Sequence, residues 1–192
     1  MARPHFPNLD AIAELPDSEV RFYAIVGAVI SLTSALEHRV VDIFQRALAI
    51  SEEQAAAMLL GIRASSIQRD LALTAMTFKV SQKPELAAEW QQLAARIVAA
   101  TGQRGERNVV GHNPVSAHME MSGAIGGAPI GALPIGGGPV WEFFVHIPPE
   151  RLAGDKPPRA VDFQTLMTAA KTLIALIKDL GSFLNRLSHG AQ

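Results

Sequence analysis

The sequence predicts an all-α fold, an up-and-down helical bundle with a β-hairpin inserted before the last helix. Apolar residues recur at three- and four-residue spacing over most of the chain, alternate in two short stretches after residue 114, and resume helical spacing at the end. A chain of 192 residues is typical of one domain with a sizeable core. We expect an extended N-terminal arm over residues 1–17 and one helical domain over residues 18–192, with the hairpin insert at 114–148.

The arm is expected because Pro4, Pro7 and Pro16, with turn signals around Asn8, disfavour a helix there. This N-terminus has no apolar stretch and no small-residue cleavage site, so we expect no signal peptide and a cytoplasmic protein.

A first long helix is predicted from near Asp17-Ser18 to about Ile50 by its apolar stripe. Its uncharged run, Phe22 to Leu36, is shorter than the roughly 20 apolar residues that span a membrane, so a buried helix and no membrane contact are expected. The stripe consists of Phe22, Ile25, Val26, Val29, Thr33, Leu36, Val40, Ile43, Phe44, Ala47 and Leu48.

Three more helices are predicted before residue 114. Ser51 and Gln54 have the spacing of a capping box, which begins a short helix to about Gly61. The next helix is expected from Ser65 or Ser66 to about Val80, on the spacing of Ile67, Leu71, Thr74, Ala75 and Phe78. Pro84 suits the first turn of a further helix, which is expected to end by Asn113 after a kink or break at Thr101-Gly102.

Alternation predicts two half-buried strands, from Val115 to Ser122 and from Trp141 to Ile147. The Gly- and Pro-rich residues 123–138 between them are expected to form a long hairpin connection. A final amphipathic helix is predicted from Val161 to about Leu187.

Composition limits the chemistry. Because the chain has no Cys, disulfides, thiolate metal sites and a Cys nucleophile are excluded. The net charge of −1 gives no overall field that attracts nucleic acid, so any RNA contact must come from a local basic patch.

The stretch from Glu106 to Pro114 carries the strongest chemical signal. On a helix Asn108 and His112 share a face, so the Asn amide can orient the imidazole, and the long Arg107 side chain can reach the same groove. Because Pro114 ends the helix, His112 lies near unpaired carbonyls that favour its protonated form, which predicts a raised pKa. A cation beside such an imidazole can hold a phosphodiester and move a proton.

Arg107, the polar residue Asn108 and His112 match the Arg-polar-three residues-His motif, and the chain resembles the HEPN domain family in this motif and in its helical bundle. The resemblance covers roughly residues 18–113 and the last helix. It implies a homodimer in which two motifs face one cleft and form one composite site for metal-independent RNA cleavage, with no cofactor. It also implies that His112 is the general base for the ribose 2′-OH, that Arg107 stabilises phosphorane-like charge, and that Asn108 orients or binds phosphate. The product end would be a 2′,3′-cyclic phosphate.

Other residues admit two interpretations. Glu37 lies on or beside the apolar stripe of the first helix, so it either pairs with Arg107 and fixes the guanidinium or lies in water at the edge of the stripe. A polar strand face could imitate a metal site, but a solvated sheet face is far more common, and no metal is expected. That face would carry His118, Glu120, Glu142 and His146.

Three functions remain open on these residues. The leading hypothesis is a HEPN-like ribonuclease, a toxin or defence effector that acts as a homodimer on RNA and has an antitoxin protein as a partner. Its rival is a non-catalytic helical dimerisation module in which Arg107, Asn108, Glu37 and His112 form a structural polar network. A small-ligand sensor that uses the same cleft is the third.

Overall fold

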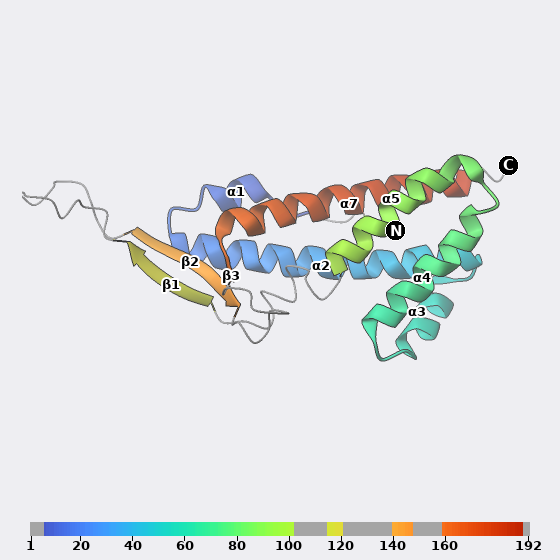
Figure 1. Cartoon of the computed structure of the whole chain (residues 1–192), viewed down its shortest axis with the longest axis horizontal. Helices are drawn as coiled ribbons and strands as arrows, with labels where there is room; N and C mark the ends of the chain where they lie inside the picture. Colours follow the sequence, from blue (N-terminus) through green and yellow to red (C-terminus); the bar gives the residue numbers. More distant parts are fainter. Residues whose placement is uncertain (1–5, 102–114, 121–139, 148–158, 190–192) are drawn as a thin grey trace, which may run out of the picture.

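The computed structural model describes residues 6–101, 115–120, 140–147 and 159–189, which are predominantly helical (Figure 1). The predicted helical class is therefore confirmed for this part of the chain. Two long helices, α2 (Ser18–Leu48) and α7 (Phe163–His189), form its backbone. They lie side by side and run in the same direction (Figure 1).

Contacts at both ends fix the alignment of α2 with α7. At the beginning, the Arg21 guanidinium lies 5.4 Å from the centroid of the Phe163 ring. At the far end, Arg46 donates a hydrogen bond of 2.6 Å to the Ser188 hydroxyl. Between these contacts the two helices bury their apolar stripes against each other, because each carries large side chains at three- and four-residue spacing.

Local signals set the helix limits as the sequence predicts. The Asp17 carboxylate accepts from the Val20 N–H at 2.9 Å and begins α2. Helix α3 (Glu52–Leu60) begins with the predicted capping box, in which Ser51 and Gln54 exchange hydrogen bonds of 3.0 and 3.2 Å.

Helices α4 (Ser65–Val80) and α5 (Pro84–Thr101) form an antiparallel pair across the far half of α2 and α7 (Figure 1). Trp90 holds the pair together. Its indole N–H donates 2.9 Å to the Thr77 hydroxyl, and its ring stacks on Phe183 of α7 with centroids 5.5 Å apart. This side chain is fully buried, so the polar tip of the indole is satisfied inside the core.

Helix α4 does not pack through the face whose apolar spacing predicts the helix. Its outer face carries Ile67 and Phe78, which are 58% and 72% exposed. The packed face is made of smaller or flexible side chains, namely Ala72, Leu73, Met76 and Val80.

Three strands form an antiparallel sheet in the order β1-β2-β3: β1 (Val115–Glu120), β2 (Val140–Ile147) and β3 (Arg159–Val161). Val145 lies at the centre of the register, opposite Val115 on one side and Val161 on the other. The sheet packs on the beginning of α2, where the rings of Phe143 and Phe22 have centroids 6.3 Å apart. Residues 121–139, between β1 and β2, lie outside the described residues.

Two sequence predictions need correction. The N-terminal arm is not extended throughout, because residues Leu9–Ala13 form the short helix α1. Asn8 accepts from the Ala11 N–H at 3.2 Å and caps α1, whose five residues contain no proline, and burial of Leu9 attaches it to the core. The strand β3, directly before α7, is also absent from the prediction.

Among the described helices, α2 is the one long and apolar enough to cross a membrane by length and composition. Eleven of its residues are buried in the bundle, and nine of them belong to the predicted stripe. The stripe prediction was wrong for Leu48, which is 43% exposed, and it left out the buried Ala28 and Leu32.

Candidate functional site

The three residues of the motif, Arg107, Asn108 and His112, lie outside the described residues, as does the whole segment 102–114. Glu37 is described. It is half-buried on α2, one helical turn after the buried Thr33, so the two share a face of that helix. The expected contact between Glu37 and Arg107 falls outside the residues that the structure describes.

A pocket of about 560 Å³ opens between the middle of α2, the end of α5 and the first half of α7. Thr33 comes from α2, and Arg96 and two alanines come from the last turns of α5. Its volume falls within the range of about 300–1,000 Å³ that is typical of small-molecule sites. The lining is completed by Asp162, Gln164, Thr165, Thr168, Ala169, Thr172, Leu173 and Leu176.

Four threonines supply the hydroxyl groups of this lining, and three of them already donate their proton within their own helix. Thr33 donates to the Val29 carbonyl at 2.8 Å, Thr168 to the Gln164 carbonyl at 2.8 Å, and Thr172 to the Thr168 carbonyl at 2.9 Å. A hydroxyl has one proton and two acceptor lone pairs. These threonines can therefore accept hydrogen bonds from a ligand but have no proton left to donate.

Asp162 lies at the beginning of α7 and caps the helix. Its carboxylate accepts from the Thr165 N–H at 2.7 Å, and its carbonyl accepts from the Leu166 N–H at 3.1 Å. Hydrogen bonds from the side chain and backbone of Thr165 lower the pKa of Asp162, because they favour the ionised form. The pocket therefore has a carboxylate at one edge, and the first turn of α7 already has its anion.

Arg96 is the cation of the lining. Its guanidinium donates to the Asp179 carboxylate of α7 at 2.8 Å, and both side chains are about half exposed. This pair lies at the surface, where its free energy is small, so Arg96 keeps N–H groups that can turn toward a bound molecule.

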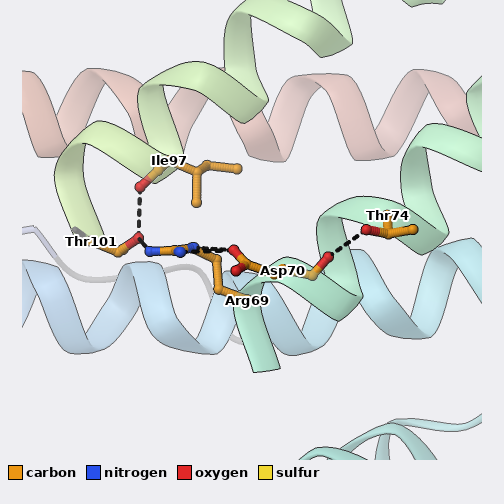
Figure 2. A network of polar contacts seen from close by, with 5 residues as sticks. All are labelled: Arg69, Asp70, Thr74, Ile97 and Thr101. Atoms are coloured by element: carbon orange, nitrogen blue, oxygen red, sulfur yellow. Dashed lines mark hydrogen bonds and ion pairs between the residues drawn. The ribbon is translucent and has the colours of Figure 1, made fainter. Parts of the chain in front are cut away.

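The end of α5, which leads into the motif segment, is fixed by a polar network (Figure 2). Arg69 of α4 donates to the Thr101 hydroxyl at 3.3 Å and to the Asp70 carboxylate at 2.8 Å. Thr101 in turn donates to the Ile97 carbonyl at 2.7 Å. Because the Arg69 side chain is only 13% exposed, the contact holds the last residue of α5 in a defined position.

The other described neighbour of the motif segment is Val115, the first residue of β1. Its register partner Val145 pairs with Val161, and Val161 directly precedes Asp162 of the pocket. Neighbouring strands are about 4.8 Å apart, so Val115 lies about 10 Å from the strand that leads into the pocket. Both chain ends that flank residues 102–114 therefore lie close to the pocket.

The strand register bears on the four residues considered for a metal. His118 is directly opposite Glu142, whereas His146 pairs with Ala160 of β3. Among the described side chains, no group of three or more His, Asp or Glu has the arrangement of a metal site.

The sequence did not single out the pocket residues Arg96, Asp162, Thr165, Thr168 and Thr172. One signal was available, since the three threonines recur at three- and four-residue spacing along one side of α7. Asp162 also precedes a helical pattern by one residue, which is a helix-cap signal. No sequence signal pointed to Arg96, because only the packing of α5 on α7 brings this side chain to the pocket.

Comparison of the chain with protein-family models, with curated proteins and with solved structures gives no match in any of the three.

Proposed function

We propose that the protein is a metal-independent endoribonuclease of the HEPN type that acts as a homodimer. Arg107, Asn108 and His112 would be its catalytic residues, and Glu37 would hold the Arg107 guanidinium. The observation that carries the proposal is the position of Thr101 and Val115, the described residues on either side of the motif segment, near one pocket.

Chain length limits how far the motif can lie from this pocket. Arg107 follows Thr101 by six residues and His112 precedes Val115 by three, which correspond to at most about 20 and 10 Å of extended chain. Ala100, the neighbour of Thr101, lines the pocket. A phosphodiester bound beside the pocket is therefore within reach of both side chains, and Glu37 is one turn from Thr33 at the same place.

The proposed reaction is a transesterification. His112 takes the proton of a ribose 2′-OH, the 2′ oxygen attacks the adjacent phosphorus, and the bond to the 5′ oxygen of the next nucleotide breaks. Arg107 stabilises the additional negative charge in the transition state, and Asn108 orients the phosphate. The leaving 5′ oxygen takes a proton from an acid in the site or from water. The products are a 2′,3′-cyclic phosphate and a free 5′-OH.

The proposal includes the organisation of the chain and its partners. Residues 18–192 would form one domain in which β1 and β2, with the residues between them, are a hairpin insert of residues 114–148. The protein would act in the cytoplasm as a toxin or defence effector, with RNA as its substrate and an antitoxin protein as its partner. The small-ligand sensor remains a second candidate, because the pocket is large enough for a metabolite.

The experiment compares wild type with His112→Ala on single-stranded RNA in EDTA. We expect cleavage by wild type and a loss of at least a hundredfold in the variant, the usual effect of removing a general base. His38→Ala is the matched control, since His38 is an exposed histidine of α2. Arg107→Ala is matched by Arg63→Ala, an exposed arginine before α4.

Light scattering must show that all variants keep a mass of twice the 20.5 kDa of the chain. Intact RNA at high excess of a wild-type dimer would reject the ribonuclease. Equal cleavage by wild type and His112→Ala would reject the assigned base.

A further inference from the structure

We propose that the pocket between α2, α5 and α7 binds a nucleobase that carries an exocyclic amino group, such as adenine or cytosine. This inference rests on the proposed function in one respect. Several flat rings carry an amino group, and the proposed ribonuclease is the reason for choosing a nucleobase among them. The hydrogen-bonding character and size of the pocket are independent of that step.

The polar side chains of the lining offer an excess of hydrogen-bond acceptors. Thr33, Thr168 and Thr172 have each given their hydroxyl proton to a backbone carbonyl four residues earlier. The Asp162 carboxylate accepts from the Thr165 N–H at 2.7 Å and can itself only accept when ionised. A ligand that matches these oxygens must bring N–H donors, and an amino group brings two.

The rest of the lining is largely apolar. Five of the lining residues are Ala or Leu, and the threonine methyl groups add to this apolar area. Thr33 is 2% exposed, whereas Thr168 and Thr172 are exposed, so the pocket is closed at Thr33 and open to solvent along α7. A flat ring buries its faces against such walls while its edge meets the row of oxygens. The apolar members are Ala99, Ala100, Ala169, Leu173 and Leu176.

The lining carries one charged side chain of each sign, Asp162 and Arg96. The carboxylate of Asp162 already occupies the beginning of α7, so the helix terminus does not offer a vacant anion site. Arg96, on the opposite wall, is half-exposed and remains able to meet a phosphate at the rim. This places the base inside and the sugar-phosphate outside, on the side of Arg96.

The test is calorimetric titration of the full chain with two mononucleotides that differ only in the amino group. Adenosine 5′-monophosphate carries it, and purine riboside 5′-monophosphate has hydrogen in its place. We expect the adenosine form to bind about tenfold more tightly, because the acceptors lose their donors in the other ligand. Neither ligand contains an internucleotide bond, so the result does not depend on cleavage.

The double variant Thr168→Val/Thr172→Val keeps the side-chain shape and removes two acceptors. It should bind the adenosine form about tenfold more weakly and bind the two ligands equally. Thr74→Val is the matched control. Thr74 of α4 makes the same hydroxyl-to-carbonyl bond, to Asp70 at 2.8 Å, but lies outside the pocket. Circular dichroism and the melting temperature verify that the variants are folded.

Equal binding of the two mononucleotides to wild type, no binding of either at millimolar concentration, or an unchanged affinity in the double variant would overturn the proposal.

A hexanucleotide of adenosine, bound by the His112→Ala variant so that it stays intact, identifies the source of the base. Tighter binding of the hexanucleotide than of the mononucleotide assigns the pocket to an RNA strand, and the reverse assigns it to a free nucleotide. If amino-group discrimination persists in a protein that does not cut RNA, the proposed ribonuclease fails and the pocket assignment stands.

Discussion

Arg69 donates a hydrogen bond of 3.3 Å to the hydroxyl of Thr101 and thereby joins the first turns of α4 to the last residue of α5 (Figure 2). The Thr101 hydroxyl in turn donates a hydrogen bond to the Ile97 carbonyl, and Arg69 also forms an ion pair with Asp70. The network therefore fixes Thr101, the last described residue before the motif segment.

Replacement of Arg69 should cost more than a surface arginine does. We expect Arg69→Ala to lower the free energy of unfolding by about 1–3 kcal/mol, because a largely buried stem and its hydrogen bonds are lost together. Thr101→Val, which removes the acceptor for Arg69 and the donor to the Ile97 carbonyl but leaves the Arg69 stem in place, should cost about 1 kcal/mol. Urea unfolding measures both. Arg63→Ala, at an exposed position, should change stability by less than about 0.5 kcal/mol, and equal losses for the two arginines would contradict this role.

Thr77 and Thr74 form a matched pair on α4. Both hydroxyls donate 2.8 Å to a carbonyl four residues earlier, but only the Thr77 oxygen also accepts from buried Trp90. Thr77→Val leaves the indole N–H without its partner, so we expect a loss of about 1–3 kcal/mol in thermal or urea unfolding. Thr74→Val should stay within about 0.5 kcal/mol of wild type. A cost for Thr74→Val as large as for Thr77→Val would refute the structural role of the Trp90 contact.

The orientation of α4 can be tested with two apolar truncations. Met76 is fully buried, so Met76→Ala should lower the free energy of unfolding by about 2–5 kcal/mol. Phe78 is 72% exposed, so Phe78→Ala should change it by less than about 0.5 kcal/mol despite removing the larger side chain. The reverse order would mean that α4 packs through its other face.

Asp162 should make stability depend on pH. Its pKa is lowered in the folded state by hydrogen bonds from Thr165, so its contribution is present above the unfolded pKa of about 3.9 and is lost as the pH falls through the folded value. Asp162→Ala should cost about 1 kcal/mol at pH 7, whereas Asp162→Asn, which still caps the helix, should cost a few tenths. Urea unfolding from pH 7 to pH 2 provides the measurement. The difference between wild type and Asp162→Asn should disappear at the acid end, and a constant difference would falsify the assignment.

Local chemistry made much of the helical framework predictable. Asp17 and the Ser51–Gln54 pair begin helices through hydrogen bonds within three residues, which sequence spacing determines directly. Helix α1 was missed because the surrounding prolines outweighed Asn8, although no proline lies within it. The short strand β3 has three residues and depends on its partner Val145, so its own sequence carries almost no signal.

Which side of a helix is buried was harder to predict where both sides are apolar. On α4 the large side chains Ile67 and Phe78 define the helical period, yet the buried face is the one that carries Ala72. The pocket was unpredictable for a related reason. Thr33, Arg96 and Thr168 belong to three helices far apart in the sequence, and only their packing brings them together.

The measurement that most directly tests the ribonuclease is the chemistry of the product ends. A short RNA with one 2′-deoxy nucleotide at the main cleavage position is compared with its all-ribose form in EDTA, with products analysed by mass spectrometry. Because the proposed nucleophile is the 2′ oxygen, we predict that wild type yields a 2′,3′-cyclic phosphate from the ribose substrate and leaves the deoxy position intact. His112→Ala should cut neither substrate. Cleavage at the 2′-deoxy position, or products without a cyclic phosphate intermediate, would contradict the assignment of His112 and Arg107 to this reaction.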